Sequence, residues 1–554
     1  MTHRSAKINM PERKLSRRKY ILVAGGGAAV AIIGGAAYYL SQKEPFPTPT
    51  PLKTLRISTE GEPVQLDPHR YRTVVDNVIT AQMMEPLIYY DKDLNIIPML
   101  STNWENVSST SWRFHLRKNV KFHDGTPFNA EAVRYNFDRL LDVERGMVAT
   151  FYIDAWMESC EVEDEYTVII NTKGPTPFAV MGANLTSIPV SINSPTAIEE
   201  WGDDEYTRHP VGTGPFKFAE WVEKEYVKME KNPDYWGEAP LLNELVFKII
   251  TEESTRYMAF LAGELDIISN LPPHRISELE ANPDYKVIRQ THLRTIITSL
   301  NMTTGAEPLK ELNVRRAIFH AIDRESIVHH ILEDLGAVAT VLPPPGVWGR
   351  LPDDEWGPHG RYPYDPEESK KLLTDAGWID TDEDGVVDKD GTPLELRYVC
   401  PDGRYLRDST VAEAIVEFLR LVGIKANLEL RDSATWVQMG KAGDFDMFLV
   451  GGAIKAEVDS CLRRWVYPQA DTPGAFGAFT GYKNPGVTEL FDQGVAEMDE
   501  AERLEMYYNA QRIIADDAAI FPIWHVMGLF ATVKDVENFE TLPNEIFALK
   551  RTDI

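Results

Sequence analysis

Cysteine is scarce in this chain, whose 554 residues include only Cys160, Cys400 and Cys461. An odd number at such wide spacing cannot build a disulfide framework, and it matches no cysteine metal-ligand set. One disulfide and three buried thiols are the two alternatives, and the sequence favours the thiols. The chain is long enough to bury a large core without covalent crosslinks, and its length predicts two to four domains.

Basic charge is also lacking over most of the chain. The formal net charge is −28, but residues 1–44 carry +6 and the remainder carries −34. A body so acidic offers no broad basic surface for phosphate-backbone binding. We therefore expect no nucleic-acid partner.

Catalytic motifs are missing as well. The sequence contains no GxSxG, HExxH, CxxC, P-loop or post-strand GxGxxG pattern. His115, His123 and Asp124 could form an acid–base or metal site, and His329-His330 lies in a run of helical periodicity. A strand–turn–helix scaffold explains the first group equally well, because the Asp-Gly-Thr-Pro run after His123 is typical of a turn. The sequence therefore predicts a protein that is not an enzyme, with an exported hydrolase as the remote alternative.

Residues 20–40 form an uncharged apolar run preceded by Arg and Lys residues, which is long enough to cross a bilayer. The SRRKYIL stretch at 16–22 resembles a twin-arginine export signal, and an ordinary secretory signal is the alternative. We expect an extracytoplasmic protein, either anchored by this segment or released by signal cleavage. The Pro/Thr-rich residues 45–53 predict a stiff, extended spacer.

Strand and helix patterns alternate through the rest of the chain. Residues 394–430 predict strand–helix–strand with a short connection, hence a parallel pair of strands. An alternating run over 112–122 predicts a strand with a break near Lys118-Asn119, followed by a helix that Asn129 caps. The residues 314–335 predict one amphipathic helix. These patterns indicate an α/β protein.

One acidic cluster forms a D-x-D-x-D-G-x-x-D loop from Asp380, Asp382, Asp384 and Asp388 around Gly385. Oxygen ligands at alternate positions around a glycine turn suit Ca²⁺. The bidentate glutamate that completes an EF-hand loop is missing, so a turn carrying solvated acids is the alternative. Apart from this structural calcium, no cofactor is expected.

Seven segments, taken in order, resemble one family. These segments are LDPH (66–69), EPLIYYD (85–91), WRFHLRKNVKFHDGTPFNAEAV (112–133), GTGPFKF (212–218), NPDYWG (232–237), STRYMAFLAGELDII (254–268) and VRRAIFHAIDRESIV (314–328). They resemble the extracytoplasmic solute-binding proteins of ABC transporters, family 5, the cluster that binds peptides, oligopeptides and nickel. The resemblance covers residues 54–545.

The resemblance implies a periplasmic-binding-protein-like fold (type II, cluster C), with two lobes, a hinge and an extra domain inserted in the N-terminal lobe. The implied ranges are lobe I at 54–85, 205–295 and 522–554, the extra domain at 86–204, and lobe II at 296–521.

The implied function is capture of a peptide-like solute between the lobes and its delivery to the transmembrane subunits of an ABC permease, by a monomer. An oligosaccharide-binding receptor is the alternative, because tryptophans can stack on sugar rings; the candidates are Trp348, Trp356, Trp436 and Trp465.

By the same resemblance, a peptide lies in the cleft as an added strand. The implied contact residues form three groups, namely Arg72, Thr73 and Val74; Gly451, Gly452 and Ala453; and Arg404, Tyr405 and Trp436. For Trp436 the alternative is core packing, and for Arg404 it is a solvated loop.

One position departs from the family pattern. Peptide-binding members carry Gly-Trp and, three residues after the Trp, an Asp that pairs with the α-amino group of the peptide. Here the tryptophan position is Gly452 and the aspartate position is Lys455. A cationic terminus would meet like charge at Lys455. Unless Asp459 or Glu457 replaces the missing acid, the ligand is not an ordinary peptide with a free amino group.

Overall fold

The computed structural model describes residues 52–71, 73–453, 455–466 and 482–554. All the described helices and strands lie in one compact unit, Lys53–Ile554. Within the described residues, no helix combines the length and the apolar character that crossing a bilayer requires. The apolar run 20–40 and the spacer residues 45–51 lie outside the described residues.

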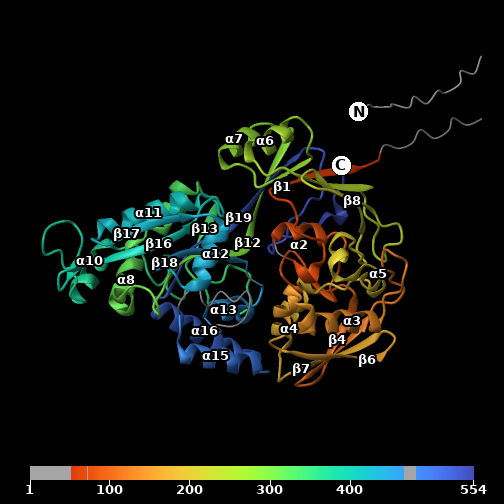
Figure 1. Cartoon of the computed structure of the whole chain (residues 1–554), viewed down its shortest axis with the longest axis horizontal. Helices are drawn as coiled ribbons and strands as arrows, with labels where there is room; N and C mark the ends of the chain where they lie inside the picture. Colours follow the sequence, from red (N-terminus) through yellow and green to blue (C-terminus); the bar gives the residue numbers. More distant parts are fainter. Residues whose placement is uncertain (1–51, 72, 454, 467–481) are drawn as a thin grey trace, which may run out of the picture. The chain divides into compact units, whose positions relative to one another are not determined.

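An eleven-stranded sheet runs through both lobes (Figure 1). Its strands follow the order β17-β16-β18-β12-β19-β11-β1-β10-β9-β8, and β13 pairs with β19. Their bounds are β1 Thr54–Thr59, β8 Phe216–Val222, β9 Tyr226–Lys231, β10 Glu244–Ile249, β11 Ile267–Ser269, β12 Tyr285–Leu300, β13 Gly336–Val338, β16 Glu395–Pro401, β17 Lys425–Arg431, β18 Met447–Ala453 and β19 Ile520–Val533.

The two longest strands, β12 and β19, join the lobes. They pair antiparallel with each other; β12 also pairs with β18 in lobe II, while β19 also pairs with β11 in lobe I. Their register shifts between Thr291 and Thr295, and such a bulge bends a strand locally. The hinge is therefore a pair of continuous strands with an irregularity at residues 292–294.

A separate four-stranded antiparallel sheet lies within the range expected for the extra domain, in the order β4-β5-β7-β6. The predicted strand break is confirmed, because β5 ends at Leu116 and Asn119 has a positive φ of 61°. The predicted cap is confirmed as well, since the Asn129 side chain accepts a hydrogen bond from Ala132 N at the start of α3. The strands and short hairpins are β2 Ile88–Tyr90, β3 Ile96–Pro98, β4 Ser101–Ser108, β5 Ser111–Leu116, β6 Met157–Asp164, β7 Thr167–Thr172, β14 Asp388–Lys389 and β15 Thr392–Pro393.

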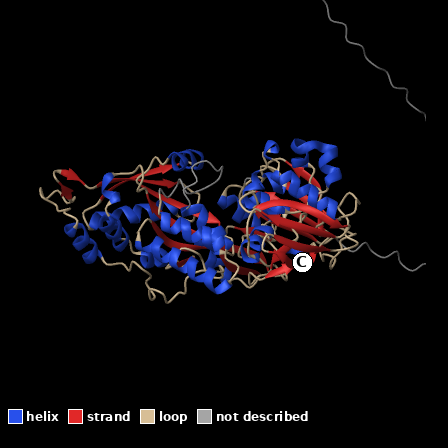
Figure 2. Ribbon diagram, turned by 90° about the horizontal axis from the view of Figure 1, so that it is seen from below, coloured by secondary structure: helices blue, strands red, loops and turns tan. Residues whose placement is uncertain are grey.

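Helices lie beside the strands in both halves of the molecule, and a group of strands on the right of Figure 2 faces the viewer. Their bounds are α2 Val74–Thr80, α3 Ala130–Leu141, α4 Phe178–Leu185, α5 Pro195–Glu205, α6 Glu253–Leu261, α7 Ile276–Glu280, α8 Leu312–Ala321, α9 Arg324–Ser326, α10 Pro366–Asp375, α11 Asp408–Leu421, α12 Ser433–Ala442, α13 Val458–Val466, α15 Pro485–Ala496 and α16 Glu500–Asp516. The predicted strand–helix–strand unit is confirmed as β16, α11 and β17, with β16 and β17 parallel.

The prediction of a single helix over residues 314–335 is wrong. Helix α8 ends at Ala321, because Ile322 has an extended backbone (ψ 116°). Asp323 then caps α9 by accepting a hydrogen bond from Ser326 N, and a π-helical turn follows over Ile327–Ile331. A local capping side chain has overridden the continuous helical periodicity.

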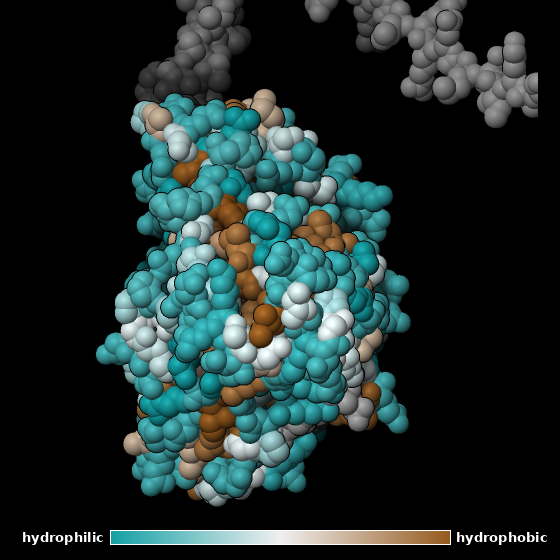
Figure 3. Space-filling model, turned by 90° about the vertical axis from the view of Figure 1, so that its left-hand side faces the viewer, coloured by the Kyte–Doolittle hydropathy of each residue, from teal (hydrophilic) through white to brown (hydrophobic). Residues whose placement is uncertain are grey.

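Separate apolar clusters form the core beside the large sheet and beside the four-stranded sheet. The three cysteines are free and buried, one in each of three such clusters, as the thiol alternative predicts. The outer face nearest α10 is mainly hydrophilic, with apolar side chains confined to narrow strips (Figure 3). Such a surface fits the acidic, solvated body inferred from the composition.

Candidate functional site

Strand β18 has one edge that its neighbours cover only in part. On one side it pairs with β12 from Met447 to Ala453. On the other side β16 pairs with it at Met447 and Phe448, and the ladder ends there in the described part of the chain. The segment from Leu449 to Ala453 therefore has an outer edge that lies beyond β16.

The backbone N–H and C=O groups of successive residues in β18 point alternately to its two edges, and this determines which residues face the outer edge. Asn301 N donates to Asp446 O across the β12 pairing (2.8 Å). In an antiparallel ladder the backbone groups of successive residues point to opposite sides. The even-numbered residues of β18 thus face β12, and the groups of Leu449, Gly451 and Ala453 face outward.

Side chains already occupy two of these outward positions. The Trp436 indole N–H donates to Leu449 O (3.2 Å). The Tyr405 hydroxyl accepts a hydrogen bond from Gly451 N (2.9 Å) and donates one to Gly451 O (3.1 Å). Tyr405 thereby satisfies both backbone groups of a residue that the resemblance assigns to ligand pairing.

The loop that carries Tyr405 is fixed by a buried carboxylate. Asp408, 1% exposed, accepts hydrogen bonds from the backbone N–H groups of Gly403, Arg404 and Tyr405 at 2.8–3.0 Å. The exposed Arg404 guanidinium lies over the rings of Trp436 and Tyr405, 5.1 and 5.7 Å from their centroids. Trp436 itself is 1% exposed, which fits the core alternative.

The glycines of β18 allow close aromatic packing. A Cβ atom at Gly452 would lie 2.2 Å from Cζ2 of Trp465, and one at Gly451 would lie 3.0 Å from Cε1 of Tyr405. Buried Trp465 thus occupies the space that a side chain at position 452 would need. Neither Trp436 nor Trp465 exposes a ring face for sugar stacking, because both are 1% exposed.

Lys455 follows β18 and contacts the extra domain. Its ammonium group lies 3.8 Å from the ring centroid of Tyr152 and donates a hydrogen bond to Asn184 Oδ1. Asn184 Nδ2 in turn lies 3.4 Å from Ser460 Oγ on α13. These contacts place the end of β18 at the boundary between lobe II and the extra domain.

The two acids after Lys455 have other partners. Glu457, 2% exposed, accepts hydrogen bonds from the backbone N–H groups of Asp459 and Ser460 at the start of α13 (2.8 and 2.9 Å). Burial, together with nearby Asp459, raises the pKa of Glu457 to about 7. Asp459 pairs with Arg463 (2.8 Å). The predicted alternative acids are therefore engaged within lobe II.

The lobe I contact segment is only partly described, since Arg72 lies outside the described residues. Thr73 caps α2 in a reciprocal capping box with Asp76, and Val74 is 38% exposed. In the LDPH loop just upstream of Thr73, Asp67 and His69 Nδ1 accept hydrogen bonds from buried Arg139 of α3 (2.6 and 3.0 Å). This network fixes the LDPH loop to the extra domain.

Burial, reinforced by the Arg139 charge, lowers the pKa of His69 to about 4. Because His69 Nδ1 accepts from Arg139, Nε2 carries the proton and donates to Ser191 O (3.0 Å). His69 is therefore a neutral structural link at neutral pH.

The histidines that suggested catalysis have separate roles. His123 Nδ1 accepts from Gly212 N (3.3 Å) and Nε2 donates to Gly214 O (3.0 Å). Asp124 accepts hydrogen bonds from Thr126 N and Ser194 Oγ. His115 lies on β5 at 3.8 Å from Glu105. The scaffold explanation thus accounts for all of their contacts in the described residues.

The acidic loop brings three of its four predicted ligands together. Oxygen atoms of Asp380, Asp382 and Asp384 lie within 4.8 Å of one another, the only such cluster in the part of the chain that the structure describes. Asp388 instead accepts hydrogen bonds from Thr381 N and Oγ1 (2.9 and 2.6 Å). The calcium assignment stays a prediction.

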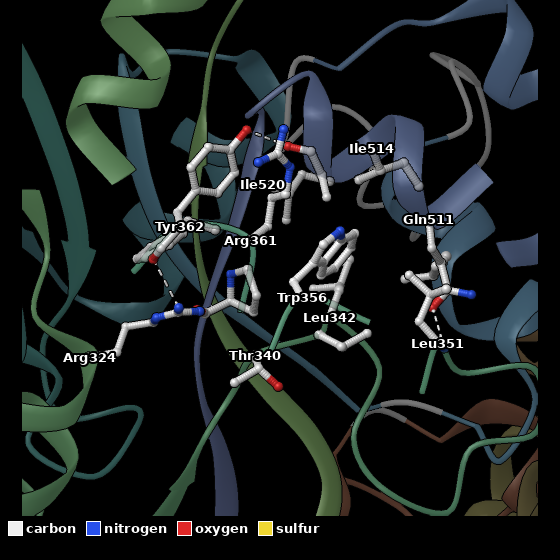
Figure 4. A pocket seen from close by; sticks show the side chains of 15 residues that line it. Arg324, Thr340, Leu342, Leu351, Trp356, Arg361, Tyr362, Gln511, Ile514 and Ile520 are labelled. Atoms are coloured by element: carbon white, nitrogen blue, oxygen red, sulfur yellow. Dashed lines mark hydrogen bonds between the residues drawn. The ribbon is translucent and has the colours of Figure 1, made fainter. Parts of the chain in front are cut away.

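A small cavity of about 40 Å³ lies inside lobe II (Figure 4). Apolar side chains form most of its wall, including Leu342, Trp356 and Ile514. Arg324 at its edge donates to the carbonyl oxygens of Ala339, Pro522, His359 and Tyr362. A space that holds only a few water molecules is too small for a peptide or a sugar.

An ion pair at the hinge has no counterpart among the sequence patterns. Arg294, opposite Ala453 in the ladder, donates to both carboxylate oxygens of Glu545 (2.8 and 2.9 Å). Burial would raise the pKa of Glu545, but the Arg294 charge and hydrogen bonds outweigh it and lower the pKa to about 2. The partners are separated by 251 residues, so no spacing rule could have related them.

Comparison with known proteins gives a consistent result. The family model described as bacterial extracellular solute-binding proteins, family 5, matches residues 95–472. The probable D,D-dipeptide-binding periplasmic protein of Escherichia coli K12 is 28% identical over 88% of this chain and 92% of its own length.

Two solved structures show the same architecture. The structure of NikA from Brucella suis in complex with Fe(III)-EDTA has a TM-score of 0.79 and 25% identity, and it covers 90% of this chain and 99% of its own. The dipeptide-binding protein of Pseudoalteromonas sp. SM9913 in complex with Met-Leu has a TM-score of 0.76 and 25% identity, covering 90% of this chain and 100% of its own.

Proposed function

Because this chain belongs to the bacterial extracellular solute-binding proteins of family 5, we propose that it is the receptor of an ABC importer and captures a peptide-like solute between its lobes. The observation that carries this proposal is the outer edge of β18. On this edge Leu449 O bonds to Trp436 and both backbone groups of Gly451 bond to Tyr405, so the pairing position is Ala453, at the boundary where Lys455 meets Tyr152 and Asn184. A peptide backbone is the ligand class that pairs with such an edge.

Peptide is favoured over oligosaccharide by the same residues. Sugar recognition would need aromatic faces exposed in the cleft, but Trp436 and Trp465 are buried. Trp348 is engaged at its indole N–H, which donates to Glu500 (3.2 Å). The curated relative in Escherichia coli is named for dipeptide binding.

The polar groups near the end of β18 fit a protein that binds its solute without converting it chemically. The buried Glu457 carboxylate accepts hydrogen bonds from the N-terminus of α13, and the buried Asp459 carboxylate pairs with Arg463. The family name and the names of the relatives describe binding proteins. We propose that the chain has no hydrolytic activity.

An extracytoplasmic location follows from the family, and we further propose that residues 20–40 hold the protein at the membrane beside its permease. The support is the charge-free apolar run behind a basic segment. Membrane fractionation of the native protein would test this, since a cleaved signal would leave it in the soluble fraction.

Thermal-shift measurement with a ligand panel tests the function. Alanine peptides of two to five residues, with free and with acetylated N-termini, and a matched set of oligosaccharides would be titrated against the purified protein. A bound solute stabilises the folded state by mass action, about 2.7 kcal/mol at one hundred times its Kd. We expect peptides to raise the melting temperature and to be recovered intact; stabilisation by sugars alone, or cleavage of the peptides, would contradict the proposal.

A further inference from the structure

Tyr405 occupies a place on β18 where a longer ligand would have to pair. An added strand bonds through the N–H and C=O of every second residue along an edge. On β18 the outward residues beyond the end of the β16 ladder are Leu449, Gly451 and Ala453, in the direction of Lys455. Both groups of Gly451 are bonded to the Tyr405 hydroxyl, at 2.9 and 3.1 Å.

One hydroxyl can hold both groups at once. A phenolic oxygen donates one hydrogen bond and accepts others, so it accepts from Gly451 N and donates to Gly451 O. This is the pair of bonds that the N–H and C=O of one ligand residue would supply in an antiparallel pairing. Tyr405 thus acts as an internal substitute for one ligand residue.

The substitute is held firmly in place. Asp408 accepts hydrogen bonds from three consecutive backbone N–H groups, the last of which belongs to Tyr405. The ring lies against Gly451, 3.0 Å from the position of a Cβ there, and the Arg404 guanidinium lies 5.7 Å from the ring centroid. Arg404 Nε also lies 3.3 Å from the hydroxyl. Displacing the ring would break contacts on several sides.

We propose that Tyr405 closes the pairing position at Gly451, limits how far the bound solute extends along β18, and thereby favours the shortest peptides. This inference rests on the proposed function. With Gly451 occupied, the next outward position is Ala453, about 6.6 Å further along the strand at 3.3 Å per residue. A ligand that pairs at Ala453 cannot continue past Gly451, because in that direction it meets the Tyr405 ring.

Calorimetric titration of N-acetylated alanine peptides of two, three, four and five residues, which carry no α-ammonium group to meet Lys455, tests the proposal on wild type and on two variants. We expect wild type to bind dialanine at least tenfold more tightly than tetraalanine. Tyr405→Ala removes both the ring and the hydroxyl and should bring the affinities for these two peptides within threefold. Tyr405→Phe keeps the ring, so it should retain the preference for dialanine.

A second measurement does not depend on any ligand. Tyr405→Phe removes the acceptor for Gly451 N–H, so hydrogen exchange at that amide should become at least tenfold faster. The matched control is Tyr226→Phe, whose hydroxyl bonds to Glu220 (2.8 Å) on the outer strand β8; it should change neither the exchange at Gly451 nor the length preference.

The results that would contradict the length inference differ from those that would contradict the proposed function. Equal wild-type affinity for dialanine and tetraalanine, or an unchanged preference in Tyr405→Ala, would overturn the length inference and leave the proposed function standing. Unchanged exchange at Gly451 in Tyr405→Phe would overturn the role of the hydroxyl. A wild-type protein that binds none of the four peptides would overturn the proposed function, and the inference with it.

Discussion

The ammonium group of Lys455 in lobe II lies 3.8 Å from the centre of the Tyr152 ring in the extra domain. The same group donates a hydrogen bond to Asn184, which is 271 residues away in sequence, so one side chain connects two parts of the molecule. The arrangement of the lobes in this structure therefore includes a cation–π contact at the expected ligand site.

Replacing Lys455 with Met should favour the open form of the ligand-free protein. Loss of the cation–π contact is worth about 1 kcal/mol, which corresponds to roughly a fivefold change in the ratio of open to closed molecules. Small-angle X-ray scattering should report a larger radius of gyration. The control is Lys92→Met, because Lys92 is exposed and pairs with its neighbour Asp93; an equal change in both variants would contradict the role of Lys455.

Replacing Lys455 with Asp should strengthen the binding of peptides with a free α-amino group. The substitution replaces repulsion by attraction at a half-buried position, and we expect at least a tenfold lower Kd by calorimetry. Lys455→Met is the control, because it removes the lysine charge without adding an acid. An N-acetylated peptide should gain nothing; unchanged affinity for the free peptide would show that residue 455 does not meet the ligand terminus.

Arg139→Met should destabilise the protein by about 3–5 kcal/mol, because it leaves the Asp67 carboxylate buried without its cation. Urea denaturation measures the free energy of unfolding. Arg134→Met on the same helix is the control, since Arg134 is exposed and its pairs with Glu131 and Asp138 lie at the surface. That change should cost less than about 1 kcal/mol, and similar losses in both variants would refute the network's importance.

Glu457 should make stability fall as the pH rises from about 4.5 to about 7. Burial raises its pKa in the folded state to about 7, so the folded protein holds a proton in this window that the unfolded chain has released. The free energy of unfolding then decreases with pH, by at most about 1.4 kcal/mol per unit. Urea midpoints of Glu457→Gln measured at pH 5 and pH 8 should differ less than those of wild type; an identical difference would assign the effect to other groups.

Calcium at the acidic loop can be tested by melting temperature. If the sequence prediction holds, adding Ca²⁺ raises the melting temperature of the wild type and a chelator reverses the rise. Asp382→Asn should abolish the response. Asp388→Asn should leave it largely intact, because Asp388 bonds to Thr381; a response to Mg²⁺ of the same size would point to general screening of the acidic surface.

Sequence patterns predicted a helix or strand correctly where residues close together in the sequence determine its structure. The strand–helix–strand unit needed only alternation, a helical stripe and Gly423, which has a φ of 87°. The cap at Asn129 and the break at Asn119 are likewise decided within a few residues. The helix expected over 314–335 failed because Asp323 interrupts it with a cap, a signal that periodicity does not contain.

At the proposed site, contacts between residues far apart in the chain could not be predicted from the sequence. The segments around Gly451 and Arg404 lie together, as the resemblance implies, but the bond between Tyr405 and Gly451 joins residues 46 positions apart. The contact of Lys455 with Asn184 spans 271 positions. Such contacts depend on how the sheet and the extra domain pack, and no pattern in either segment alone encodes them.

The continuous strands β12 and β19 also bear on how the protein unfolds. Because these strands carry backbone hydrogen bonds in both lobes, neither lobe can lose its sheet without removing a strand from the other. A bilobed protein joined by loose linkers could melt one lobe at a time. Here the shared strands couple the lobes. Heating should therefore unfold residues 53–554 in one cooperative transition, measured by calorimetry.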